Sequence, residues 1–362
     1  TLRKDFPRDL PHLQPGSLDQ FPEPCLIDGA PREFFFQFGL AEVGVFHLID
    51  QLTIWLVKAA KSSLNDPSQG WEPTLRHNLD HFISLDIEAY KNTVNRKAGW
   101  KVFDAKFFRS GQKLDTLEKG VTVLLEASTE QVPLRNNIND KQLSITSKSE
   151  TGMLGQSVTC LIWPGTSASG KPIISSTYSP ETVTTIGELK EKADNLSCLE
   201  SLENFLNSLE RYFQGFNLNL PIPVGIIFAV KRPFKLIGSV SDIELIPYVV
   251  EVRASSDRIT LFSAGNDEPV GPTQALAVAN PELMRTVSGV PELPAVSIVG
   301  AGSVGSKLAL HFAKSGIEPT SISDSGILRP AHLLCCRRVL FAPSHVAQCY
   351  VAAIFQNLRL KS

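Results

Sequence analysis

Three closely spaced glycines near the end of the chain constrain its fold more than any other feature. Gly300, Gly302 and Gly305 follow an apolar run at 295–299 and precede a helix-like stretch, SKLALHFAKSG, at 306–316. A strand that turns sharply into a helix uses glycine at these positions for the turn, for close approach of a ligand and for helix–strand packing. With a second strand predicted at 320–323, the pattern predicts a strand–loop–helix–strand unit from residue 295 onward.

This loop is of the kind that binds nucleotide phosphates. The amide groups at the start of a helix are free to donate to phosphate oxygens, and glycine lets a phosphate come close to the backbone. Asp324 stands 19 positions after Gly305, where a carboxylate can accept hydrogen bonds from ribose hydroxyls. The pattern alone does not decide between a dinucleotide and ATP. A unit that keeps its glycines for packing alone is the alternative.

The same segment resembles the adenylation domains of ubiquitin-activating enzymes and their bacterial ThiF relatives. The resemblance extends over 295–360 and is carried by IVGAGSVGSKLALHFAKSG, the aspartate at 324 and the following ILRPAHL. It implies ATP and Mg²⁺ as cofactors, and adenylation of the C-terminal carboxylate of a ubiquitin-like or other protein. The binding residues that it implies are Gly300, Gly302, Gly305, Asp324, Arg337 and Arg338.

Several positions depart from that family's pattern. Gly326 stands where the family has a second, magnesium-holding aspartate, His332 stands in place of an asparagine, and no lysine occurs in 346–351. Metal and cationic partners stabilise the anionic transition state of adenylation, each by about 3 kcal/mol. A second hypothesis is therefore a binding or scaffolding protein that has lost adenylation. A third, an NAD-dependent oxidoreductase, is disfavoured because a second Rossmann half and a catalytic histidine context are absent.

Cys25 is the candidate nucleophile at the other end of the chain. It follows Pro24 within 1–33, a stretch so rich in proline and turn-forming residues that irregular backbone is expected. Thioester transfer needs an exposed, unpaired thiol on rigid, non-repetitive backbone, because the thiolate must reach a bulky protein carboxyl group. A small buried cysteine is the alternative.

The surroundings of Cys25 resemble the catalytic half of ubiquitin-conjugating enzymes in their bacterial form. The resemblance covers 8–95, and the residues that match in order are His12, Gly16, Cys25, Leu26, Trp55, Leu56, Ala59, Ala60, Trp71, Glu72 and Pro73. It implies that Cys25 receives a protein C-terminus as a thioester. Together the two resemblances indicate a bacterial fusion of conjugating and activating domains, of the type found in anti-phage operons. We expect both ends of the chain to cut through these domains.

Between these ends the sequence predicts secondary structure but no chemistry. We expect helices at 43–64, 74–92 and 185–213, strands at 121–126 and 157–163, strand-like runs within 223–261 and a linker at 264–293. The leucine stripe of 189–209 is short for a coiled coil and favours one helix packed on a sheet. His77 and His81 have the spacing of a metal-binding pair on a helix, but we favour solvent-exposed histidines. Lys231 and Arg232 are expected on a solvated face.

Composition narrows the function classes further. The 362 residues carry 35 basic and 37 acidic side chains, and a net charge of −2 gives no basis for binding nucleic acid or an anionic membrane. No run of about 18 apolar residues predicts a membrane span. The six cysteines are too irregularly spaced for a disulfide framework, and His332, Cys335 and Cys336 do not suit zinc, so no metal site built by clustered ligands is expected. A cytoplasmic location is expected.

The expected fold class is α/β and α+β, in three domains. Residues 1–105 form a partial ubiquitin-conjugating-like α+β unit, 106–290 a connecting α+β domain with a linker, and 291–362 the start of a Rossmann-like ThiF unit. The expected function is ATP-dependent activation and thioester transfer of a protein C-terminus, without complete turnover by this chain alone. A homodimer is left open.

Overall fold

The computed structural model of the chain divides into two compact units, Thr1–Ala277 and Val278–Ser362. The structure describes residues 2–7, 10–14, 21–27, 34–35, 37, 39–74, 79–111, 121–134, 143–167, 169–178, 181, 183–212, 220–252, 266–278, 284–285, 287–289, 296–300, 304–317 and 319–323.

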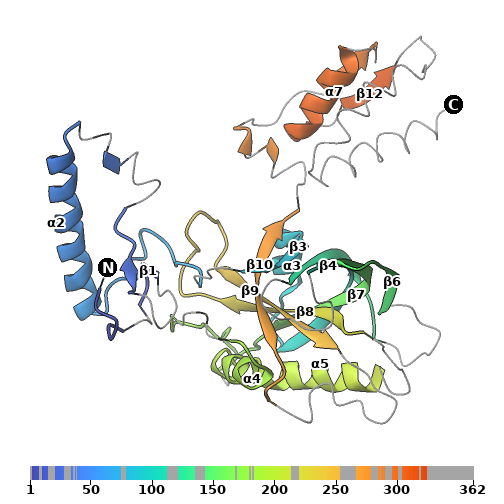
Figure 1. Ribbon diagram of the computed structural model, residues 1–362, viewed down its shortest axis with the longest axis horizontal. Coiled ribbons are helices and arrows are strands. Elements are labelled where there is room, and N and C mark those ends of the chain that lie inside the picture. The colour runs from blue at the N-terminus through green and yellow to red at the C-terminus, as the bar shows by residue number, and fades with distance from the viewer. Residues whose placement is uncertain are drawn as a thin grey trace. The chain divides into compact units, whose positions relative to one another are not determined.

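A closed β-barrel forms the body of the first unit (Figure 1). Its strands follow one another in the order β4-β5-β3-β10-β9-β8-β7, and β7 pairs back with β4. This closure pairs the edges of β4 and β7 that would otherwise be open to another chain. The short β6 pairs with the first half of β7, and β8 with the second half. The strands are β3 (His81–Leu85), β4 (Gly99–Ser110), β5 (Thr122–Gln131), β6 (Ser144–Lys148), β7 (Gly152–Trp163), β8 (Ile222–Lys231), β9 (Ile243–Val252) and β10 (Val270–Ala277).

The strand register places one set of side chains inside the barrel. Thr159 of β7 lies opposite Gly225 of β8. A Cβ on Gly225 would stand 2.7 Å from the Thr159 hydroxyl oxygen and 3.1 Å from Leu125 of β5. Because β5 and β8 are not neighbours in the sheet, the contact with Leu125 runs across the interior. Glycine suits this position because a Cβ would press on Thr159 of the neighbouring strand and on Leu125 of the facing wall.

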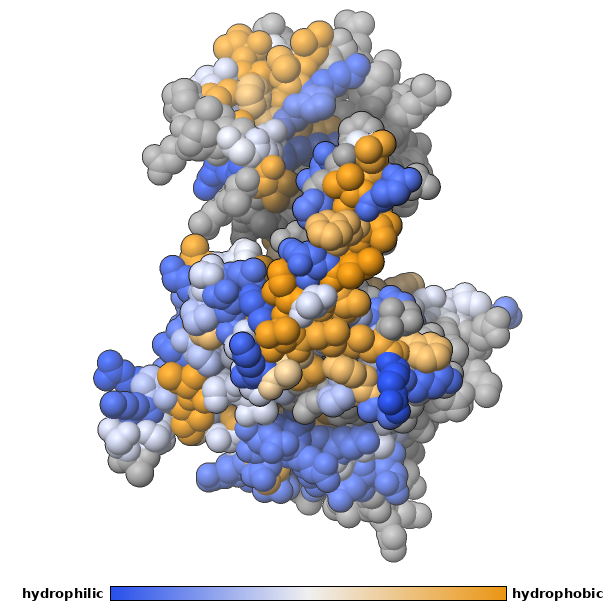
Figure 2. Space-filling view, turned by 90° about the vertical axis from the view of Figure 1, so that its left-hand side faces the viewer, coloured by the Kyte–Doolittle hydropathy of each residue, from blue (hydrophilic) through white to orange (hydrophobic). Residues whose placement is uncertain are grey.

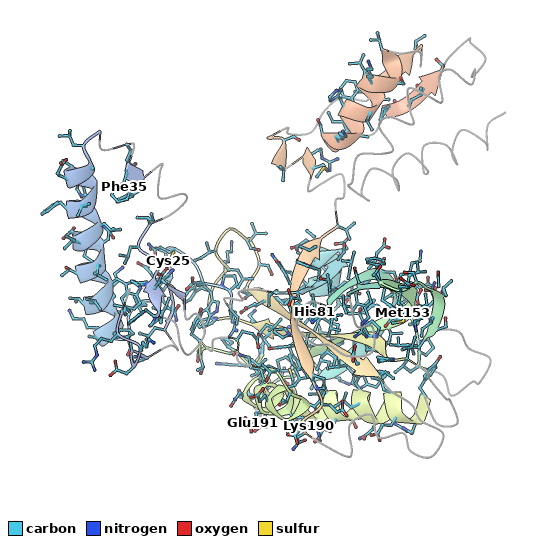
Figure 3. All side chains as sticks on the ribbon, viewed as in Figure 1. Cys25, Phe35, His81, Met153, Lys190 and Glu191 are labelled. Carbon is cyan, nitrogen blue, oxygen red and sulfur yellow. The ribbon has the colours of Figure 1, made fainter. Side chains whose placement is uncertain are left out.

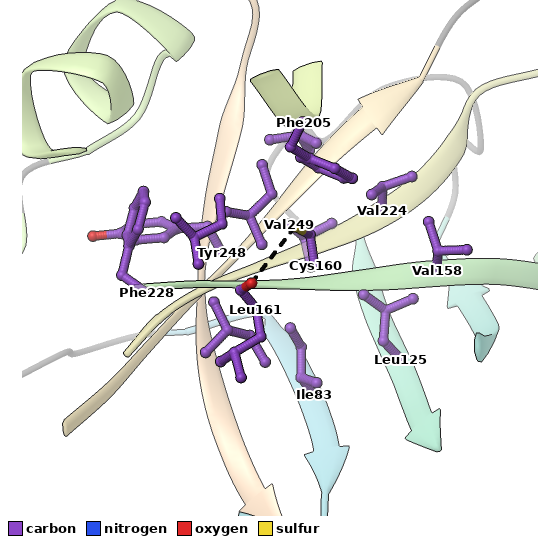
Figure 4. Close-up of a cluster of buried hydrophobic side chains, with 14 of the residues drawn as sticks. Ile83, Leu125, Val158, Cys160, Leu161, Phe205, Val224, Phe228, Tyr248 and Val249 are labelled. Carbon is purple, nitrogen blue, oxygen red and sulfur yellow. Dashed lines mark hydrogen bonds between the residues drawn. The ribbon is translucent and has the colours of Figure 1, made fainter. Parts of the chain in front are cut away.

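Two helices pack on the barrel, where the leucine pattern predicted one helix packed on a sheet. α4 (Ile186–Asn195) begins with a capping box between Thr185 and Glu188, and α5 (Leu199–Tyr212) contacts β4 and β7. The ring of Phe205 on α5 lies 5.7 Å from that of Trp100 on β4. Figure 4 shows Phe205 in one buried cluster with residues from the strands.

The single helix expected at 185–213 is instead two helices. Between them Ser197 has a φ of 56°, in the left-handed region that ends helices. The amide of Cys198 donates to the carbonyl of Ala193 at 2.7 Å, which terminates α4. Both helices bury their leucines in the same core, so the leucine spacing continues across the break and conceals it.

The helix expected at 74–92 is wrong over 81–85, which form β3. The side chains of HFISL alternate between buried and half-buried, the period of two that a strand shows. The following helix, α3 (Ile87–Thr93), starts only after Asp86, whose carboxylate accepts from the amide of Ala89 at 3.0 Å. A short apolar run fits either period, and here pairing with β5 and β10 decides it.

The linker expected at 264–293 contains a central strand of the barrel, β10, which lies between β3 and β9. Pro269, Gly271 and Pro272 suggested a turn. Gly271 serves packing instead, because a Cβ there would stand 2.2 Å from the ring of His81. Gly271 therefore reflects close packing between β10 and β3 and not a turn.

The expected domain limit at residue 105 falls inside β4, and the preceding β3 also belongs to the barrel. The barrel takes strands from 81 to 277 because β3 pairs in parallel with β10, which is remote in sequence. Composition and turn residues carry no information about such a pairing.

A polar layer lies at one end of the barrel interior, formed by His81, Arg109 and Glu251. Arg109 forms an ion pair with Glu251, and their side chains are 0% and 2% exposed. His81 accepts a hydrogen bond from the amide of Val123 through Nδ1, at 3.3 Å. Burial lowers the pKa of His81, Asp80 opposes this, and the Arg109 charge lowers it further. The imidazole is thereby favoured in its neutral, accepting form.

The N-terminal segment forms a short hairpin that packs on one helix. β1 (Leu13–Gln14) pairs antiparallel with β2 (Glu23–Pro24). Leu13 packs with Trp55 of α2 (Ala41–Ala60) and with Leu64 in a small buried core. The helix predicted at 43–64 is confirmed, and it ends at Ala60.

α2 is apolar well beyond the face that it buries. Phe46 and Ile49 are 67% and 59% exposed, and Figure 2, which faces this helix, shows hydrophobic residues gathered over it. Among the described residues, α2 is the one helix long and apolar enough to cross a membrane by length and composition. Core helices of soluble proteins can have the same length and composition.

The described core of the second unit is a strand–helix–strand arrangement. β11 (Val296–Val299) leads through the glycine loop into α7 (Gly305–Lys314), and β12 (Pro319–Ser323) returns parallel to β11. The predicted order of elements from residue 295 onward is confirmed. The Rossmann-like ThiF assignment itself stays a prediction.

The buried ion pair gives a test of the barrel. Replacing Arg109 with Met leaves the Glu251 carboxylate buried beside an apolar group, which we expect to lower the free energy of unfolding by about 3–5 kcal/mol. Adding Glu251→Met should recover most of that loss, because no charge then remains uncompensated. Equilibrium urea unfolding of the single and double variants checks this. Strictly additive losses in the double variant would contradict it.

Candidate functional site

Cys25 lies directly after β2 on the N-terminal hairpin, and its side chain is exposed (Figure 3). Its amide donates to the carbonyl of His12 at 2.8 Å, which extends the pairing of Leu13 with Pro24 by one residue. The thiol lies 3.8 Å from the carbonyl oxygen of Ile27, to which it can donate a weak hydrogen bond. The thiol thus projects from backbone held on one side by a strand partner.

The other described cysteines lie in quite different surroundings. Cys160 and Cys198 are buried. Burial raises the pKa of Cys160 well above its usual range and that of Cys198 to about 12. Neither forms the thiolate that nucleophilic attack requires at neutral pH. Cys335, Cys336 and Cys349 lie outside the described residues. Among the described thiols, Cys25 is therefore the one placed for chemistry with a large partner.

His12, the hairpin partner of Cys25, is held in a strained backbone conformation. Its φ is 55°, in the left-handed region that costs a non-glycine residue about 1–3 kcal/mol unless its surroundings hold it there. Its amide donates to the carboxylate of Glu72, and its Nδ1 lies 3.6 Å from Oε2 of the same carboxylate. Glu72 therefore contacts both the backbone and the ring of His12.

Glu72 is a largely buried carboxylate. Burial raises its pKa, while the hydrogen bond from the His12 amide and the His12 charge lower it. The net shift is upward, so the folded protein binds a proton at Glu72 more tightly than the unfolded chain does. The contribution of Glu72 to stability is therefore largest at low pH and falls as the pH rises through its folded pKa.

The residue before Glu72 anchors this segment to the barrel domain. The amide of Trp71 donates to the carbonyl of Lys235 at 2.7 Å, and the amide of Ile237 donates to the carbonyl of Trp71 at 2.9 Å. The indole, 2% exposed, packs against the ring of Phe234 at 5.5 Å. Trp71 is thus fixed through both its backbone and its side chain.

Arg232 is the cation around which this junction forms. Its guanidinium lies over the Trp71 ring at 5.1 Å and donates to Glu244 at 2.6 Å. It also donates to Ser175 at 2.9 Å. The other Glu244 oxygen accepts from the amide of Thr74 at 2.7 Å. The chain on either side of Glu72 is therefore tied to the barrel.

The expectation that Arg232 lies on a solvated face is wrong, because the residue is 2% exposed. Sequence analysis missed both Arg232 and Glu244 as parts of the junction. The available signal was that an arginine and a glutamate stand on either side of one connection, just beyond β8 and within β9. That signal is weak in a sequence where charged residues mostly lie at the surface.

The glycine loop has the close packing that its motif predicts. Gly300 has a φ of 91°, its amide donates to the carbonyl of Ser323 at 2.7 Å, and the space where its Cβ would lie is open. A Cβ on Gly305 would stand 1.7 Å from the Gly300 carbonyl oxygen, so only glycine fits at the start of α7. The other implied binding residues, Gly302, Asp324, Arg337 and Arg338, lie outside the described residues.

Clustered metal ligands are not found in the part of the chain that the structure describes: no group of three or more His, Cys, Asp or Glu residues lies close enough together. The two histidines considered for a metal do not form a helical pair. His81 lies on β3 and faces the barrel interior, and His77 lies outside the described residues.

Comparison with known proteins places the hairpin and α2 in a family context. The family model of prokaryotic E2 family A matches residues 1–94, about a quarter of the chain. The match supports a bacterial E2-like domain in this segment and, in general terms, a conjugation-related function that involves a protein substrate. No curated protein matches the chain.

Thiol exposure predicts selective labelling. In the native protein at pH 8, iodoacetamide should modify Cys25 more than about tenfold faster than Cys160 or Cys198, because their burial removes both access and thiolate. Peptide mass spectrometry after timed labelling gives the three rates, and labelling in urea is the control in which all three react. Similar native rates at Cys25 and Cys198 would contradict the assignment.

Proposed function

We propose that Cys25 accepts the C-terminal carboxyl group of a protein, ubiquitin-like or other, as a thioester. The observation that carries the proposal is an exposed thiol on a held hairpin, inside the segment that matches the prokaryotic E2 family. The coarser, conjugation-related function follows from the match, and the chemistry of Cys25 is what we add. The resemblance to fusions of anti-phage operons supports a role of that type.

The reaction that this site supports is transthioesterification. The Cys25 thiolate attacks the carbonyl carbon of a donor thioester, and a new carbon–sulfur bond forms. The bond from that carbon to the donor sulfur breaks, and the donor sulfur leaves with the electron pair and takes up the proton that Cys25 released. No atom changes oxidation state. An exposed thiol suits this step because both reacting groups belong to proteins.

The glycine loop of the second unit would bind the nucleotide that activates the protein carboxyl group. Two features support this proposal: the space beside Gly300 is open, and the amides at the start of a helix can donate to phosphate oxygens. Gly300, Gly302, Gly305, Asp324, Arg337 and Arg338 would hold the nucleotide, which supplies the adenylate leaving group. Gly326 is a poor match for a magnesium ligand, which favours keeping the scaffold hypothesis as the alternative.

Thioester capture by Cys25 is directly testable. The full chain is incubated with a small protein whose C-terminus is a mercaptoethanesulfonate thioester, and the mixture is analysed under non-reducing conditions. We expect an adduct with the summed mass of the chain and the protein thioester less the released mercaptoethanesulfonate, and hydroxylamine should cleave it. Cys25→Ala should abolish it, and the matched Cys198→Ala variant should retain it. An equal yield from the Cys25→Ala protein would refute the proposed function.

Nucleotide binding by the loop is tested by calorimetric titration with ATP and with NAD. ATP is expected to bind the wild-type chain, and Gly305→Ala should weaken binding more than about tenfold because the added Cβ displaces the start of α7. Leu308→Ala, an exposed position on the same helix, is the control and should bind normally. Tighter binding of NAD would favour the oxidoreductase, and no binding of either would favour the scaffold.

A further inference from the structure

We propose that Glu72 is a positioning residue that ties the hairpin of Cys25 to the barrel domain and so sets the backbone from which the thiol projects. The inference rests on the proposed function of Cys25 and adds to it. It assigns to the barrel, for which the sequence indicated no chemistry, the role of a platform for the thiol.

A short chain of hydrogen bonds runs from Glu72 to Cys25 through the backbone of His12. The Glu72 carboxylate accepts from the amide of His12, and the carbonyl of His12 accepts from the amide of Cys25 at 2.8 Å. Both polar groups of the His12 backbone are therefore engaged, one toward the barrel side and one toward the thiol. This contact joins two segments that are 60 residues apart in sequence.

The backbone on both sides of Glu72 is hydrogen-bonded to the barrel domain. Trp71 on one side pairs through its backbone with Lys235 and Ile237. Thr74 on the other side donates to Glu244 at 2.7 Å, and Glu244 is held by Arg232 at 2.6 Å. A carboxylate placed between two anchored positions can impose its own geometry on His12, whereas a carboxylate on free backbone would follow the hairpin.

The left-handed backbone conformation of His12 depends on contacts from several segments. A histidine at a φ of 55° is held there by its surroundings, and the described contacts that hold it are the Glu72 carboxylate, the Cys25 amide and the packing of the neighbouring Leu13 against Trp55. The hydrophobic contacts fix where the hairpin lies on α2. The Glu72 contact fixes the turn that precedes β1 and therefore the partner strand of Cys25.

The test separates positioning from thiol chemistry. Three variants of the full chain are compared with wild type: Glu72→Ala, the near-isosteric Glu72→Gln, and the matched control Glu88→Ala. Glu88 is an exposed carboxylate on α3 whose described contact is an ion pair with Lys91. Hydrogen exchange is followed in peptides that cover residues 10–27 and in barrel peptides. Acyl transfer from the mercaptoethanesulfonate protein thioester gives kcat and KM, and iodoacetamide gives the intrinsic reactivity of the Cys25 thiol.

In Glu72→Ala we expect hairpin amides to exchange about tenfold faster and kcat to fall about tenfold, the scale of one lost buried hydrogen bond. KM, barrel exchange and the alkylation rate should stay near wild-type values, because the thiol is already exposed. Glu72→Gln keeps an accepting oxygen and should restore most of both losses. A general loss of stability would instead raise exchange in the barrel and would not be rescued selectively.

Unchanged hairpin exchange and kcat in Glu72→Ala would overturn the proposal, and so would equal losses in Glu88→Ala. If no thioester forms on the wild-type chain, the function proposed for Cys25 fails, and hydrogen exchange alone still decides whether Glu72 holds the hairpin. If Glu72→Ala does not fold, the comparison of Glu72→Gln with wild type carries the test: a hairpin that exchanges more than about tenfold faster despite the retained acceptor contradicts the hydrogen-bond argument.

Discussion

The pairing of β4 with β7 is the constraint on which the first unit depends. These two strands pair along their whole lengths, from Gly99 opposite Trp163 to Ser110 opposite Gly152. The pairing turns a sheet with two open edges into a closed barrel, and only a closed barrel has an interior in which Arg109 and Glu251 can be buried together. The close approach of opposite walls at Gly225 follows from the same closure.

The barrel also provides a surface on which a remote segment is held. Trp71 and Glu72 follow α2 in the chain, yet their contacts are with residues beyond position 230 on one side and with His12 on the other. Burying Arg232 and Glu244 together costs desolvation that good geometry must offset. The junction meets this condition, because the described partners of Arg232 include a carboxylate, a hydroxyl, backbone carbonyls and an aromatic ring. A buried charge pair of this kind specifies one arrangement of the two segments.

Local patterns in the sequence predicted the elements whose cause is local. The helix at 43–64 and the strand–loop–helix–strand unit at 295–323 follow from apolar spacing and from glycines whose conformations the chain itself requires, as Gly305 shows. The predictions failed where a distant partner decides. HFISL is a strand because β5 and β10 pair with it. Residues 270–277 form a strand despite their proline and glycine because β3 and β9 pair with them.

The candidate site divides in the same way. The sequence alone identifies Cys25 as the candidate nucleophile. Its neighbouring proline and the matching residues that follow in order are features of the chain itself, so no fold is needed to find them. Its exposure, its pairing with His12 and the contact of Glu72 with that residue were decided by tertiary structure. Arg232 shows the reason most clearly: a charge is solvated or buried according to what packs on it, and its partners Trp71, Ser175 and Glu244 come from three separate segments that only the folded chain brings together.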